Sequence, residues 1–263
     1  MIDLFSSKLK GNTLIFRLDP RTKFIALIIV FTSILFIKHI EYYLIWVFAL
    51  CIIIVGNRIH PRFILRPLKF FVWLLFITFI FHSLLTPGRV FYHFARIYIT
   101  YEGMHNGLFF SFRLFLIILF TYIFSLTTNP MDLTDGLSRL LSPLRKIRIP
   151  VDDLFTIVLI ALRFTPTLFE QASKILLAQK ARGLNLNVSL AKKIRHIATI
   201  IVPIILLSLK RAHELAFALE ARWYHPGKKR THFIEMKVTK ADFALMFSLI
   251  VFTGGIHACE ILR

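Results

Sequence analysis

Two arginines, Arg182 and Arg222, are the side chains of this sequence best suited to bind a partner. Each follows an alanine near the end of a helix-like segment, in Ala181-Arg182-Gly183 and in Ala221-Arg222-Trp223. A guanidinium group makes paired, charge-assisted hydrogen bonds to carboxylates and also binds carbonyl groups. We therefore predict that both segments contact another protein; the alternative is a surface helix with a basic C-terminus, which is common.

Helical spacing precedes Arg182. Residues on one face recur at intervals of three and four, and Gly183 follows where a helix C-terminus prefers glycine. A cation in the last turn also meets the negative end of the helix dipole. The spacing predicts an amphipathic helix with Arg182 at its tip, whose face is formed by Ala172, Ile175, Leu176 and Gln179.

A similar helix is predicted before Arg222. Its stripe is rich in small side chains, which allow another helix to approach closely, and Pro226-Gly227 limit its continuation. Two such helices could cross and hold one arginine at each tip, as a rigid lever requires. The stripe consists of Leu209, Ala212, Ala216 and Leu219.

Other chemistry finds little support in the sequence. No Gly-x4-Gly-Lys-Ser/Thr or Gly-x-Gly-x-x-Gly occurs, so we expect no nucleotide site, and no cofactor is predicted. His213-Glu214 lacks the second histidine of a zinc-binding helix. Asp152-Asp153 resembles half of the Asp-rich motif of membrane prenyltransferases, but no second such motif appears. We expect this pair to cap a helix near Pro150, and we predict no metal site and no catalytic residue.

Composition places the chain in a membrane. It has 263 residues, of which 57% are hydrophobic, and a formal net charge of +19. Because the positive charge lies between long apolar runs, we interpret it as setting membrane orientation and meeting anionic lipid, with no nucleic acid as partner. The two cysteines, Cys51 and Cys259, lie far from other thiols and are predicted to be small buried hydrophobic residues.

The apolar runs predict an all-α, polytopic membrane protein with about five transmembrane helices. We expect an N-terminal membrane domain at 1–126 with four of them, a coupling-helix region at 127–240, and a C-terminal span at 241–263. Within the central region, the apolar segments Val151–Phe164 and Thr199–Leu209 are short and flanked by charges. We interpret them as helices at the membrane interface, the alternative being two further crossings.

Charge asymmetry orients these spans. The N-terminus, the basic loop Gly56–Lys69 and the central region are predicted to be cytosolic, and the C-terminus external. We expect a multi-pass protein of the cell membrane with a cytosolic N-terminus. Arg113 interrupts the fourth span; an arginine at such a position is costly and marks either function or a structural partner.

The order and spacing of several motifs are similar to those of a known family. The chain resembles the transmembrane coupling (T) component of energy-coupling factor transporters, which are ABC-type importers of vitamins and metal ions. The resemblance covers most of the chain and rests on Leu18-Asp19-Pro20-Arg21-Thr22-Lys23, Thr127-Thr128-Asn129-Pro130, Leu141-Ser142-Pro143-Leu144, Pro150, Ala161-Leu162-Arg163-Phe164, Pro166, Ala178-Gln179-Lys180-Ala181-Arg182-Gly183, Arg211-Ala212 and Ala221-Arg222.

The resemblance implies a role for both tips. In the family, two Ala-Arg-Gly helix ends dock in grooves of two cytosolic ATPases, which implies this role for Ala181, Arg182 and Gly183 and for Ala221 and Arg222. It also implies a membrane-embedded substrate-binding (S) subunit and hydrolysis by the partner subunits alone. Trp223 departs from the family's glycine; because tryptophan resists a left-handed cap, we expect the helix to continue towards Gly227.

Two alternatives remain at this stage. One is a dedicated permease for a single ion such as cobalt or nickel. The other is a membrane-embedded enzyme acting on a lipid-linked diphosphate, with Asp152 and Asp153 binding a metal–diphosphate.

Overall fold

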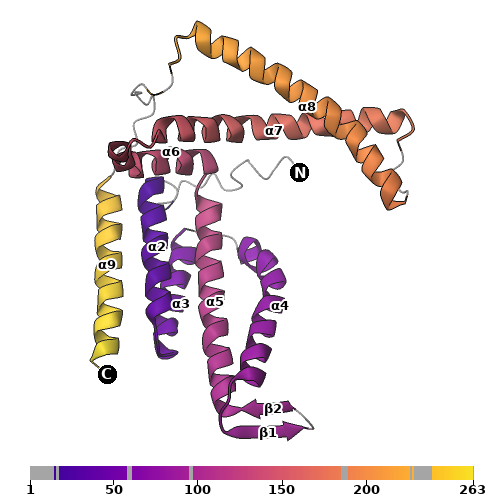
Figure 1. The fold of residues 1–263 in the computed structure, drawn as a ribbon. Coiled ribbons are helices and arrows are strands. Elements are labelled where there is room, and N and C mark those ends of the chain that lie inside the picture. The colour runs from indigo at the N-terminus through magenta and orange to yellow at the C-terminus, as the bar shows by residue number, and fades with distance from the viewer. Residues whose placement is uncertain are drawn as a thin grey trace. The chain divides into compact units, whose positions relative to one another are not determined.

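A computed structural model describes residues 15, 18–57, 61–94, 97–184, 189–225, 227 and 239–262. The chain divides into two compact units. The first, here the membrane unit, contains Ser7–Asn129 and Met236–Arg263; the second, here the arm unit, is built on Pro130–Glu235. Helices make up nearly all of both units, which confirms the predicted all-helical class (Figure 1).

The membrane unit holds five described helices and a short hairpin. Helix α2 is followed by α3, and the longer helices α4 and α5 are separated by an antiparallel pair of strands, β1 and β2. Helix α9 comes from the other end of the chain. The bounds are α2 Pro20–Phe36, α3 Glu41–Gly56, α4 Pro61–Leu85, β1 Val90–Phe94, β2 Ile97–Thr100, α5 Tyr101–Thr127 and α9 Lys240–Ile261.

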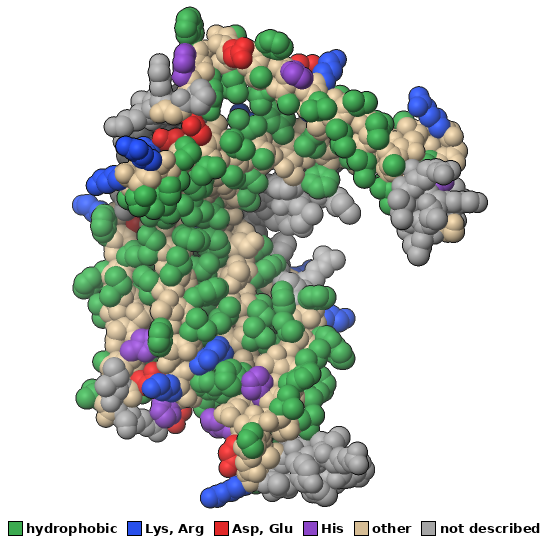
Figure 2. All heavy atoms as spheres, viewed as in Figure 1, with side chains coloured by type: hydrophobic (Ala, Val, Ile, Leu, Met, Phe, Trp, Pro, Cys, Tyr) green, Lys and Arg blue, Asp and Glu red, His purple; other side chains and the backbone are tan. Residues whose placement is uncertain are grey.

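Apolar side chains cover the outside of these helices as well as their core. Within the described residues, three segments are long and apolar enough to cross a membrane, at Leu68–Leu85, Tyr101–Thr127 and Lys240–Glu260, and α3 is a shorter apolar helix. Large hydrophobic side chains are exposed on the same helices (Figure 2), Phe70 to 80%. Such a surface suits lipid and not water.

Both cysteines correct an expectation. Cys51 and Cys259 were predicted to be buried, but both are exposed. An apolar residue on a membrane helix gains as much from lipid as from a protein core, so hydrophobicity in the sequence does not indicate which face is packed.

The helix starts follow from local hydrogen bonds. Asp19 caps α2, because its carboxylate accepts from the backbone N–H of Arg21 at 3.0 Å while Pro20 occupies the first helical turn. Thr239 and Asp242 form a capping box at the start of α9. The Asp242 carboxylate also accepts from the backbone N–H of Asp19 at 3.0 Å, so it joins the starts of α2 and α9.

Arg113 in α5 has structural partners. Its Nε donates to the Tyr43 hydroxyl at 2.9 Å and its Nη2 to the Ile37 carbonyl at 2.8 Å. The guanidinium also lies 4.7 Å from the centre of the Phe109 ring. Because Ile37 ends α2 and Tyr43 lies in α3, this arginine fixes the turn between those helices against α5.

Two glycines let α4 and α5 approach each other closely. Gly103 and Gly107 are four residues apart on α5, and both are buried. A Cβ atom added at Gly107 would lie 2.9 Å from the Phe79 carbonyl oxygen, and one at Gly103 would lie 2.8 Å from the Ser83 carbonyl oxygen. This is the small-xxx-small pattern that membrane helices use to pack.

We predict that Gly107→Leu destabilises the membrane unit by about 1–3 kcal/mol, because the new side chain forces the backbones of α4 and α5 apart. Thermal unfolding in detergent measures the loss. Gly255→Leu in α9 is the matched control, since nothing lies within 4 Å of its added Cβ. Equal melting temperatures for the two variants would contradict the close packing.

The arm unit begins with α6, Pro130–Leu140, and a 3-10 turn, η2, at Ser142–Ile147. Two long helices follow, α7 at Val151–Ala181 and α8 at Leu190–Ala221. The interface segments predicted at Val151–Phe164 and Thr199–Leu209 are therefore not separate helices. Each is continuous with the segment that ends in Ala-Arg, although Pro166 and Pro203 lie inside.

Candidate functional site

The end of α7 is a complete Schellman motif. The backbone N–H of Gly183 donates to the Lys180 carbonyl at 3.0 Å, and that of Leu184 donates to the Gln179 carbonyl at 3.0 Å. Gly183 has φ +89°, the left-handed conformation that this motif requires. The predicted stop at Gly183 is confirmed, and it leaves Arg182 as the C-cap residue.

The end of α8 has the same motif without a glycine. The N–H of Trp223 donates to the Glu220 carbonyl at 2.9 Å, and the N–H of Tyr224 donates to the Leu219 carbonyl at 3.0 Å. Trp223 itself is left-handed, with φ +55°. The expectation that α8 continues towards Gly227 is therefore wrong. The two backbone hydrogen bonds offset a conformational cost of roughly 1–2 kcal/mol for an L-residue.

Both tips present an arginine to solvent. Arg182 and Arg222 are exposed C-cap residues, and Ala181 and Ala221 are the last helical residues before them. Among the residues that the structure describes, neither guanidinium has a hydrogen-bonding or ionic partner. With respect to these residues, each guanidinium therefore keeps its five N–H donors available to another molecule.

The second tip carries an additional aromatic group. Trp223 is 83% exposed, and the His225 ring stacks on it with ring centres 6.2 Å apart and planes at 13°. The His225 Nδ1 lies 2.9 Å from the Trp223 carbonyl oxygen, which holds the two residues together. Sequence reasoning singled out Trp223 but missed His225. The available signal was the position of this histidine, two residues after the tryptophan.

Helices α7 and α8 cross and run in opposite directions (Figure 1), so the two tips lie at opposite ends of the pair. The amide oxygen of Gln171, with the amide oriented towards α8, accepts from the Arg211 guanidinium. Near the start of α7, the Asp153 carboxylate accepts from the Gly227 backbone N–H at 2.9 Å. Asp153 therefore joins the start of α7 to the segment that follows the end of α8.

The acidic pair does not cap α7 through its side chains. Pro150 is the N-cap and makes no side-chain cap, while Asp152 forms an ion pair with Arg145 in the preceding 3-10 turn. Asp152 and Asp153 do lie in the first turn, where carboxylates favour the helix dipole. No group of three potential metal ligands occurs within the described residues, so the metal–diphosphate alternative gains no support there.

Fold and tips together define a helical membrane protein with two crossed helices that each end in an exposed arginine. A family model described as cobalt transport protein, CbiQ, matches residues 11–233. An energy-coupling factor transporter transmembrane protein, EcfT, of Bacillus subtilis (strain 168) is 35% identical over 244 residues, which cover 92% of each chain. The EcfT of Brevibacillus brevis is 38% identical over 237 residues, 88% of each chain.

The chain belongs to this family of transporter membrane components. The EcfT of Lactococcus lactis subsp. cremoris is also similar, with 36% identity over 254 residues that cover 95% of each chain. Neither comparison supports the alternative of an enzyme acting on a lipid-linked diphosphate.

Proposed function

We propose that this chain is the coupling subunit of an energy-coupling factor transporter. Two cytosolic ABC-type ATPases would bind the tips of α7 and α8, and a separate membrane subunit would bind the imported vitamin or metal ion. The supporting observation is the pair of exposed arginine caps at opposite ends of two crossed helices, neither of which has a partner among the described residues. ATP hydrolysis would then reside in the partner ATPases.

The proposed mechanism is mechanical. Helices of 31 and 32 residues are about 46–48 Å long, so a small rotation at a tip becomes a larger displacement at the far end. The Gln171–Arg211 contact between the two helices would help α7 and α8 to move together. Closure of the ATPases would thus displace both helices and reorient the substrate-binding subunit.

An apolar stripe on α8 suits contact with that membrane subunit. Ile197, Ile201, Ile205 and Leu209 recur every four residues on one face and are exposed by 41–55%. Exposed apolar residues that line one face of a helix mark an interaction surface. The stripe therefore gives the lever a second point of contact, distinct from its tips.

Copurification tests the assembly. The tagged chain, extracted in mild detergent, should retain two ATPase subunits and a small membrane protein. Arg182→Ala together with Arg222→Ala should lose the ATPases and retain the membrane subunit, because the helices and the α8 stripe are intact. Retention of both ATPases by the double variant would overturn the assignment of the tips.

Orientation gives a further prediction. With Cys51 and Cys259 replaced by serine, a cysteine at exposed Lys174 in α7 should resist membrane-impermeant thiol reagents in intact cells, because the arm unit is cytosolic. A cysteine at exposed Arg89 should react, since this residue follows α4 and is expected on the external side of the membrane. Positions Asn187 and Lys228, which also test the topology, lie outside the described residues. Labelling at Lys174 from outside would refute the topology.

A further inference from the structure

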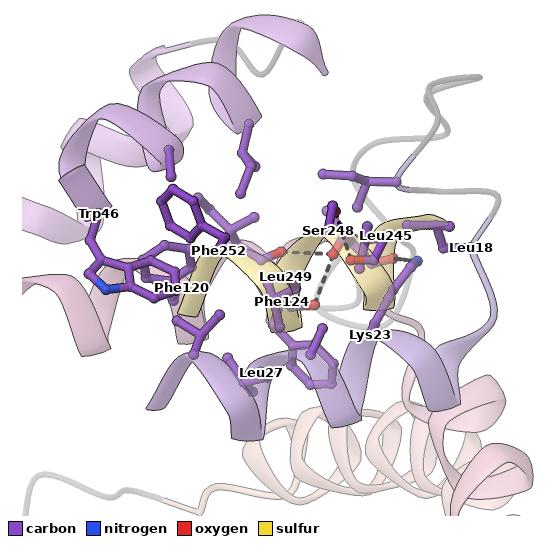
Figure 3. Close-up of a pocket in the computed structure, with 17 residues that line it drawn as sticks. Leu18, Lys23, Leu27, Trp46, Phe120, Phe124, Leu245, Ser248, Leu249 and Phe252 are labelled. Carbon is purple, nitrogen blue, oxygen red and sulfur yellow. Dashed lines mark hydrogen bonds between the residues drawn. The ribbon is translucent and has the colours of Figure 1, made fainter. Parts of the chain in front are cut away.

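An apolar cavity of about 380 Å³, open to the outside of the membrane unit, lies between α2, α3, α5 and α9 (Figure 3). Its volume falls in the range of ligand pockets. Trp46 closes part of the wall, packed edge-on against Phe120 and Phe252 with ring centres 5.6 and 5.3 Å apart. Leu27 and Leu249 line it from α2 and α9.

The two hydroxyl groups in the wall already donate within their own helices, and the Trp46 indole N–H is buried away from the cavity surface, so the cavity offers water few partners. The Thr127 hydroxyl donates within its own helix, with the Ile123 carbonyl at 2.9 Å, and the Ser248 hydroxyl donates to the Leu245 carbonyl at 2.9 Å. A buried water needs two to four polar partners, whereas an apolar cavity stays dry or takes an apolar guest. An empty cavity would also forfeit dispersion contacts along its lining.

One end of the cavity carries a positive charge. Lys23 lines it and is 9% exposed, and its ammonium group donates to the Thr127 carbonyl at 3.0 Å, at the last residue of α5. The remainder of the lining is almost wholly apolar. An amphiphile with an anionic head and a hydrocarbon tail matches this combination, and the surrounding bilayer supplies such molecules.

We propose that the cavity is a phospholipid site, in which one acyl chain fills the space between α2, α3, α5 and α9 and the phosphate lies at the end marked by Lys23. A protein helix is an unsuitable occupant, since with its side chains it is about 10–12 Å wide. The acyl chain would act as a packing element between α9 and the helices from the N-terminal half of the chain.

Tryptophan fluorescence tests the site directly. The chain has three tryptophans, of which Trp46 lines the cavity while Trp73 and Trp223 are exposed by 68% and 83%. A variant with Trp73→Phe and Trp223→Phe retains Trp46 alone. Reconstituted in vesicles of phosphatidylglycerol with brominated acyl chains, it should lose most of its fluorescence relative to unbrominated vesicles, because bromine quenches only at short range.

Filling the cavity separates a bound chain from lipid around the protein. Ala49→Phe, in the same single-tryptophan background, should restore Trp46 fluorescence, since Ala49 lines the cavity. Ala244→Phe, on an exposed position of α9 outside the lining, should leave the quenching unchanged. A second background that retains only Trp73 should be quenched in every case and confirms reconstitution.

Two results would overturn the site. Trp46 fluorescence that is equal in brominated and unbrominated vesicles would mean that no acyl chain enters. Quenching that Ala49→Phe and Ala244→Phe leave equally strong would assign it to the surrounding lipid. Vesicles of brominated phosphatidylcholine show whether a zwitterionic phospholipid fills the cavity equally well, in which case the phosphodiester alone meets Lys23.

Discussion

Trp223→Gly should make the chain more stable and its complex weaker. Glycine adopts the left-handed conformation without the roughly 1–2 kcal/mol that the φ of +55° costs an L-residue, so the melting temperature should rise by about 2–8 °C. The same change removes an exposed indole, whose burial in a partner groove is worth about 2–3 kcal/mol. Affinity for one ATPase should fall roughly 30- to 150-fold.

The informative feature of this experiment is that stability should rise while affinity for the ATPase should fall. A tryptophan at a strained, 83% exposed position adds little to the fold beyond its stacking with His225. Its contribution is therefore expected in a complex. Binding of each ATPase is measured separately, with Gly183→Ala as the matched control; this change strains the first tip and should weaken only the other ATPase. Unchanged affinity of Trp223→Gly for both ATPases would rule out burial of the indole in a partner groove.

Sequence reasoning could locate the tips because their signals are local. Arg182 is placed by Gly183, a residue with a known conformational preference at helix ends. The end of α8 was missed for the same reason: the preference of tryptophan argued against a cap. In the structure, two backbone hydrogen bonds from Trp223 and Tyr224 outweigh that preference.

The length of the arm helices was harder to predict. Hydropathy changes between Val151–Phe164 and the segment that ends at Arg182, so the two parts looked like separate elements. Backbone hydrogen bonding does not follow hydropathy, and Pro166 interrupts neither α7 nor its direction enough to divide it. Contacts such as Asp153–Gly227 join residues 74 positions apart, which no local pattern indicates.

Arg182→Glu and Arg222→Glu should each detach one ATPase. Removing a charge from a desolvated, hydrogen-bonded contact costs about 2–5 kcal/mol, and reversal adds repulsion, so affinity should fall by roughly 30-fold or much more. The lost partner should differ between the two variants because the tips lie at opposite ends of the crossed helices. Association of each purified ATPase with the reconstituted chain measures this. Lys180→Glu is the control for general electrostatics. Lys180 is an exposed charge near the same helix end, and its side chain makes no cap hydrogen bond.

Substrate uptake by each single variant then tests whether the two helices act as one lever. Sites far apart with no shared partners lose binding energy additively. If the Gln171–Arg211 contact transmits movement between α7 and α8, each single variant should abolish substrate uptake while leaving the other ATPase bound. Uptake in Arg182→Glu that stays near half of the normal rate would show that each helix works alone. Normal uptake and normal association in both variants would reduce the arginines to ordinary surface residues.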